Sequence, residues 1–141
     1  MSDRKRAGDP RGEPHWHPLT ELPWISALMD EQLDALEDSY SAMNEVRQTP
    51  YELDDALVDQ SMGLLQGTLD DAWVFDEQLA RWKKEELNEE QEEEVERLIR
   101  VMAKSRELCE QGLELARELK KGTIDRVMAA MKEMFKMPSQ N

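Results

Sequence analysis

Apolar residues recur at helical spacing along most of this chain, and no stretch alternates apolar and polar residues as a strand would. The first such series begins near Pro23, a residue that favours the start of a helix. Its apolar positions follow at intervals of three and four, and they are Leu28 or Met29, Leu33, Leu36, Tyr40, Met43 and Val46. The spacing predicts a first helix over about residues 23–48.

Two capping-box patterns divide the remaining helical sequence. Thr49-Pro50-Tyr51-Glu52 predicts that one helix stops and another starts there, with the Thr49 and Glu52 side chains each bonding to the other's backbone. Asn88-Glu89-Glu90-Gln91 repeats this chemistry more weakly. We therefore expect a second helix over about 50–86 and a third over about 89–121.

Both of these helices carry a continuous packing face. On the second helix it comprises Leu57, Ser61, Leu64, Thr68, Ala72, Phe75, Leu79 and Trp82. On the third it follows an unbroken heptad, as in a coiled-coil-like contact, through Val95, Leu98, Met102, Ser105, Cys109, Gly112, Ala116 and Leu119. Two helices of similar length with a short connection pack antiparallel.

A short fourth helix is predicted after Lys120-Lys121-Gly122, where cations suit the negative helix end and glycine can supply a left-handed cap. Thr123 is expected to cap this helix, which spans about 124–136. The fold class is therefore all-α: a long antiparallel helical hairpin within an up-down-up three-helix bundle, plus a short C-terminal amphipathic helix. Residues 20–141 are predicted to form one helical domain, and the aliphatic-poor, proline-containing residues 1–19 a flexible arm.

Composition narrows the classes of partner. The chain has 141 residues with a net charge of −14, and 35% of its residues are charged. Such an acidic protein is repelled by nucleic acid and by anionic membranes, and suits a basic partner. The single cysteine allows no intrachain disulfide, and no apolar run approaches the roughly 20 residues of a membrane span. We expect a soluble cytoplasmic protein that binds neither membrane nor nucleic acid directly.

The sequence offers little catalytic chemistry. Both histidines lie in His15-Trp16-His17, so the helical body has no imidazole to act as a base or metal ligand, and the chain has no phosphate-binding glycine motif. Cys109 lies on the heptad seam and is expected to be a buried, inert thiol. We therefore expect no catalytic, cofactor-binding or metal-binding residue.

The acidic block from Glu85 to Glu96 leaves one alternative open. Its members are Glu85, Glu86, Glu89, Glu90, Glu92, Glu93, Glu94 and Glu96. Carboxylate pairs four residues apart on a helix can hold Mg²⁺ for phosphate chemistry. However, the motif Glu52-x-x-Asp55 precedes the block rather than following it. A solvated helix start is the favoured interpretation, and whether the block binds a metal or a basic partner stays open.

Glycines inside helices point to close packing. Gly63 and Gly67 on the second helix and Gly112 on the third each cost about 1 kcal/mol relative to alanine. Folding the hairpin about its turn brings all three to one level, beside Cys109. We predict a close helix contact there, with a small cavity that admits a partner as the alternative.

The fourth helix is the best candidate for contact with another molecule. Its apolar face is rich in methionine, which adapts to varied partners, and its other residues are mildly basic. The candidate interaction residues are Val127, Met128, Met131, Met134 and Phe135. Packing of this face on its own bundle is the competing interpretation.

These features favour a non-enzymatic protein–protein interaction module, acting through a helical-bundle surface and forming a homodimer that buries uncovered apolar surface. One alternative is an acidic, antitoxin-like inhibitor that masks a basic nucleic-acid-binding surface. The other is a Mg²⁺-dependent all-α phosphohydrolase.

Overall fold

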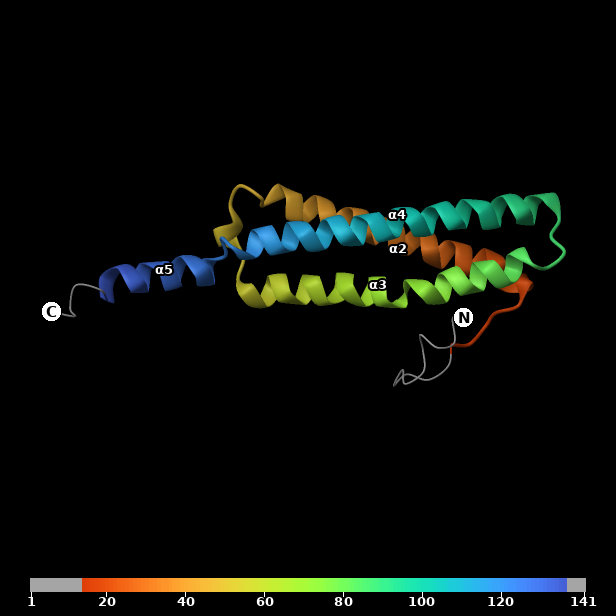
Figure 1. Ribbon diagram of the computed structural model, residues 1–141. Coiled ribbons are helices and arrows are strands. Elements are labelled where there is room, and N and C mark those ends of the chain that lie inside the picture. The colour runs from red at the N-terminus through yellow and green to blue at the C-terminus, as the bar shows by residue number, and fades with distance from the viewer. Residues whose placement is uncertain (1–13, 137–141) are drawn as a thin grey trace. The chain divides into compact units, whose positions relative to one another are not determined.

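The chain is all-α, as predicted (Figure 1). The computed structural model describes residues 14–136, and among these it contains no strand. The elements in order are η1 (Leu19–Glu21), α2 (Leu22–Glu45), η2 (Pro50–Glu52), α3 (Asp55–Lys83), α4 (Glu89–Lys120) and α5 (Ile124–Lys136). Residues 1–13, most of the predicted flexible arm, lie outside the described part.

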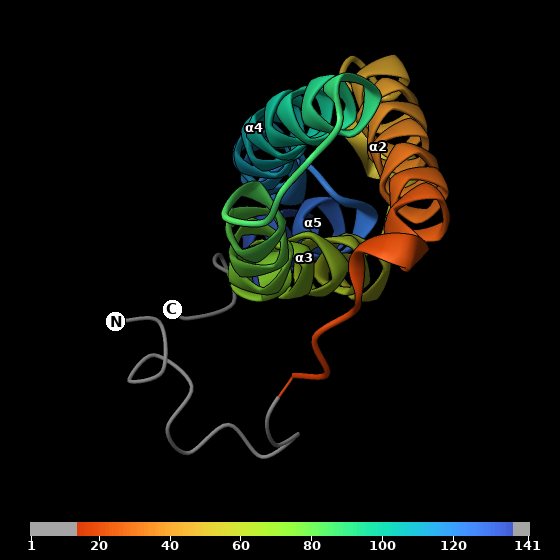
Figure 2. The same cartoon turned by 90° about the vertical axis from the view of Figure 1, so that its right-hand side faces the viewer.

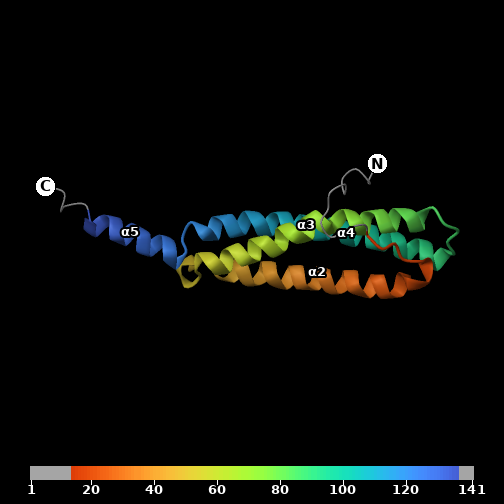
Figure 3. The ribbon, with the colours of Figure 1, turned by 90° about the horizontal axis from the view of Figure 1, so that it is seen from below.

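Contacts divide the chain into two compact units that share the three long helices. Within the described residues, unit 1 comprises 14–35 with 68–107, and unit 2 comprises 36–67 with 108–136. In each unit, segments of α2, α3 and α4 pack side by side, and α3 runs opposite to the other two (Figures 2 and 3). This is the predicted up-down-up arrangement. The single domain over 20–141 stays a prediction.

Unit 1 is built around a buried tryptophan. Trp82 is fully buried, and its indole Nε1 donates a hydrogen bond to the His17 carbonyl at 3.0 Å. Apolar side chains from all three helices complete the core: Leu22, Ile25, Met29, Ala72, Leu79, Val95, Leu98, Val101 and Met102.

Residues 14–19 of the predicted flexible arm contact α3, and the flexibility of residues 1–19 stays a prediction. The His17 N–H donates to the Gln78 side chain at 2.7 Å, and Gln78 Nε2 donates back to the His17 carbonyl at 3.2 Å. Trp16 meets Trp73 edge to face, and the Arg81 guanidinium lies 4.3 Å from the Trp16 ring centre. The prediction rested on the proline and aliphatic content of these residues. It did not include this contact, because the contact is made by aromatic side chains and backbone polar groups.

The predicted heptad seam of α4 is confirmed: all eight of its positions are buried. The predicted face of α3 is wrong in the first half of that helix. Leu57 and Leu64 are 49% and 69% exposed, whereas Val58 and Leu65, each one residue later, are buried in unit 2. One residue turns a helix by about 100°, so this half of α3 presents a different face to α4.

Of the two predicted capping boxes, the one expected to be weaker forms and the one expected to be stronger does not. Asn88 and Gln91 form the full reciprocal pair, with their side chains accepting from each other's backbone N–H at 2.8 and 2.9 Å. The box at Thr49 is wrong, because Thr49 makes no side-chain cap and precedes only the short η2. The cap of α3 is instead Asp54, whose carboxylate accepts from the Leu57 N–H at 2.8 Å.

Candidate protein-binding surface

The α5 helix exposes its apolar face. Apolar residues recur along it at spacings of three, one, three, three and one, which places them on a single stripe. The exposed fractions are 40% for Ile124, 37% for Val127, 49% for Met128, 45% for Met131, 68% for Met134 and 76% for Phe135. No residue of α5 is buried in the described chain. Residues 14–136 therefore do not cover the face on which the sequence placed its candidate interaction residues.

The start of α5 is nevertheless firmly attached within unit 2. The Ile124 N–H donates to the Leu53 carbonyl at 2.8 Å. The Thr123 hydroxyl donates to Asp55 Oδ1 at 2.7 Å, and the Asp55 N–H donates to Asp125 Oδ2 at 2.6 Å. Thr123 is fully buried, and its side chain ties the start of α5 to α3.

Charge reinforces this attachment. Asp55 Oδ2 lies 3.3 Å from Arg126 Nε. The hydrogen bond from Thr123, with the positive charges of Arg126 and Lys120, holds the pKa of the Asp55 carboxyl below its usual value. Lys120 Nζ also lies 2.6 Å from Asp59 Oδ1. Asp55 is thus an ionised anchor between α3 and α5 at neutral pH.

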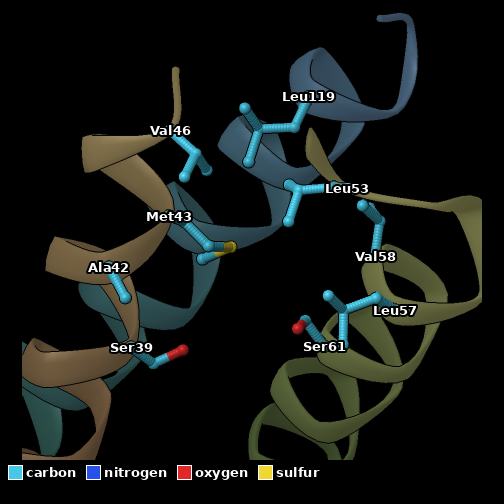
Figure 4. A pocket seen from close by; sticks show the side chains of 9 residues that line it. All are labelled: Ser39, Ala42, Met43, Val46, Leu53, Leu57, Val58, Ser61 and Leu119. Carbon is cyan, nitrogen blue, oxygen red and sulfur yellow. The ribbon is translucent and has the colours of Figure 1, made fainter. Parts of the chain in front are cut away.

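An apolar groove opens in the same unit, between α2 and α3 and over the end of α4 (Figure 4). Its volume is about 220 Å³. Seven of its nine lining residues are apolar and the other two are serines: Ser39, Ala42, Met43, Val46, Leu53, Leu57, Val58, Ser61 and Leu119. The side chains converge from the two walls toward the space between them (Figure 4).

Gly63 and Gly67 do not form the predicted close contact. A Cβ added at Gly63 or Gly67 would meet nothing within 4 Å, so these two positions face open space. Gly112 is closely packed against the Leu65 side chain. A Cβ added at Gly112 would lie 2.9 Å from Leu65 Cδ1. Cys109 is buried as expected, and burial raises the pKa of its thiol. The prediction failed because the shift of the α3 face turns Gly63 and Gly67 away from α4.

The acidic block is partly neutralised inside unit 1. Arg97 donates to both Asp30 oxygens at 3.0 Å, and to both Glu94 oxygens at 3.0 and 2.8 Å. The hydrogen bond from Arg97 holds the pKa of Glu94 below its usual value, and Lys83 Nζ, 2.8 Å from Glu96 Oε2, does the same for Glu96. Across residues 14–136, no three His, Cys, Asp or Glu side chains gather as metal ligands would.

The sequence predicted the apolar stripe of α5 but not the apolar groove. The stripe on α5 follows from its spacing, but the groove does not, because Leu57 and Ser61 had been assigned to the packed face of α3. The bidentate Arg97–Asp30 pair was also missed, since its partners lie 67 residues apart. A signal for the groove existed in the small residues Ser39, Ala42 and Ser61, which line its walls.

Comparison with protein-family models, with curated proteins and with solved structures finds no match to this chain. Within residues 14–136, no helix combines the length and apolar character that crossing a membrane requires. The geometry of unit 2 is therefore the basis for a functional assignment.

Proposed function

We propose that this chain is a non-enzymatic protein-binding module of the cytoplasm, with α5 as its contact helix. One observation carries the proposal: the apolar stripe of α5 stays exposed although the start of the helix is fixed. A helix of 13 residues is marginal in water unless its apolar face is covered. Methionine side chains give this face an adaptable surface of the kind found in helix-in-groove recognition.

A matched pair of variants on α5 tests the proposal. Met131→Glu adds a negative charge to the apolar stripe, whereas Ala129→Glu adds the same charge about 160° away around the helix, taking 100° per residue. Tagged full-length protein and both variants are used to retain proteins from a native extract, which are then quantified by mass spectrometry. Proteins retained by the parent and by Ala129→Glu should be lost with Met131→Glu. Equal retention by all three would refute the role of α5.

The acidic-inhibitor hypothesis has its own support in unit 1. Four carboxylates at the start of α4, Glu89, Glu90, Glu92 and Glu93, are exposed. Raising the salt from about 0.1 M to about 1 M shortens the screening length from about 10 Å to about 3 Å. Basic proteins held by this face would be released by salt and retained by the Met131→Glu variant. Proteins docked on α5 would show the opposite pattern.

A further inference from the structure

We infer that the partner of α5 is a second copy of this chain, and that each copy places its α5 helix in the other copy's groove between α2 and α3. This inference rests on the proposed function, because the proposed function makes the apolar face of α5 the surface that a partner covers. It joins two observations in unit 2: an exposed apolar stripe and an unfilled apolar groove.

The helix cannot reach its own groove while its start stays attached. The bonds from Ile124 to Leu53 and from Thr123 to Asp55 fix the first turn, and Pro50 packs against Gly122 just before it. With this start, α5 projects beyond the end of α4 instead of folding back along α2 or α3 (Figure 1). Occupying its own groove would require breaking these contacts, whereas occupying that of another copy leaves them intact.

The groove can receive part of α5, since its lining runs from Ser39 to Val46 on the α2 side and from Leu57 to Ser61 on α3. The α5 helix has 13 residues, which span about 20 Å at 1.5 Å per residue. The part of α3 that belongs to unit 2 runs from Asp55 to Gly67, which is also 13 residues. Small side chains on the walls, at Ser39, Ala42 and Ser61, leave room for methionine and phenylalanine. An added helix would complete a four-helix arrangement with α2, α3 and α4.

Charge favours the same occupant. The α2 wall segment (36–45) contains Glu37, Asp38 and Glu45 and no lysine or arginine. On the α3 wall, Asp55 and Asp59 already pair with Arg126 and Lys120 of the same chain. On α5, Arg126, Lys132 and Lys136 outnumber Asp125 and Glu133, so this helix is net positive within a chain of charge −14. The acidic side chains that flank the apolar groove on α2 attract a helix of net positive charge.

Both halves of the contact belong to one chain, so the exchange can be reciprocal. Two copies related by a two-fold axis would each give one helix and receive one, and no groove or stripe would be left over. The exchange therefore predicts a closed dimer rather than a longer assembly.

Sedimentation velocity on the full chain tests this arrangement. The parent should form a dimer, which Met131→Glu and Leu57→Lys should each weaken by roughly tenfold or more in dissociation constant, as expected for a central apolar contact. The matched controls are Ala129→Glu on the other face of α5 and Ala56→Lys, one residue from Leu57. Both should leave the dimer intact.

Mixing the two defective variants gives the decisive result. Fluorescently labelled Met131→Glu keeps an intact groove, and Leu57→Lys keeps an intact α5, so one of the two contacts can form between them. At a concentration where each variant alone is largely monomeric, the mixture should contain a heterodimer. Circular dichroism checks that each variant is folded, and Ala42→Lys on the opposite wall replaces Leu57→Lys if that variant is not.

Three results would overturn the inference. One is a parent that is monomeric at about 100 µM, well above a micromolar dissociation constant. Another is a groove variant that dimerises as the parent does, because α5 would then pair with something other than the groove. The third is a mixture that shows no heterodimer. A monomeric parent that still retains proteins through Met131 would leave the proposed function standing and overturn only the dimer.

Discussion

At the scale of single residues, the same amino acid serves different purposes according to what its α-carbon faces. Gly63 and Gly67 face open space, Gly112 faces the Leu65 side chain, and Gly122 faces the ring of Pro50. The sequence shows only that three of these glycines lie inside helices. Substituting these glycines with alanine should therefore change the free energy of unfolding in different directions, which can be measured.

We expect Gly63→Ala and Gly67→Ala to raise the free energy of unfolding by about 0.5–1 kcal/mol each. Alanine removes the entropy cost of glycine in a helix, and its methyl group meets no neighbour at either position. Urea denaturation of the single variants measures the gain. Destabilisation would show that another surface approaches these positions closely in solution.

We expect Gly122→Ala to destabilise the attachment of α5 by about 1–3 kcal/mol. The new Cβ would lie 2.7 Å from Pro50 Cγ, and a proline ring has little freedom to move aside. The backbone of Gly122 is not left-handed, so the cost comes from crowding and not from the cap conformation that the sequence suggested. In a Pro50→Ala background the same substitution should cost less, and a double-mutant cycle on unfolding free energies measures the difference.

At the scale of elements, helix ends depend on whether a side chain actually reaches the backbone. Asn88→Ala should lower the free energy of unfolding by about 1 kcal/mol, because it removes the acceptor for the Gln91 N–H. Thr49→Ala should change it by less than about 0.5 kcal/mol, because Thr49 makes no side-chain cap and typical surface substitutions stay within that range. Thermal and urea unfolding of the two variants provide the comparison. Equal losses would contradict the assignment of the caps.

The attachment of α5 should weaken in acid. Its neighbours lower the pKa of Asp55 in the folded state, so its contribution is complete above the usual aspartate pKa and is lost as pH falls through the folded value. The difference in unfolding free energy between the parent and Asp55→Asn should therefore narrow as pH falls below about 4. Thr123→Val, which removes the main cause of the shift, should reduce this pH dependence. A difference that stays constant down to pH 2 would rule out the anchor role.

At the scale of the whole molecule, the three long helices contain all the buried apolar side chains of residues 14–136. Truncation after Gly122 should therefore leave most of the helical signal, because no residue of α5 is buried. It should lower the melting temperature only modestly, because it removes the buried Thr123 and its hydrogen bond to Asp55. Circular dichroism of full-length and truncated protein measures both quantities. A collapse of the helical signal would show that α5 is part of the core in solution.

The sequence by itself determined the fold class and most helix positions. The heptad of α4 requires no knowledge of its neighbours, because an unbroken apolar stripe has to be covered whatever lies opposite. The start and end of α5 follow in the same way from local spacing, as do the reciprocal caps at Asn88 and Gln91. These features depend on residues within one or two helical turns of each other.

The tertiary structure decided the features that join distant parts of the chain. It set which face of α3 is buried, and so left Leu57 on a groove wall and turned Gly63 and Gly67 to open space. It also packed residues 14–19 on α3 and tied Thr123 to Asp55. Helical periodicity cannot fix such contacts when two neighbouring positions are both apolar, as Leu57 and Val58 are, because only the surface packed against the helix selects between them.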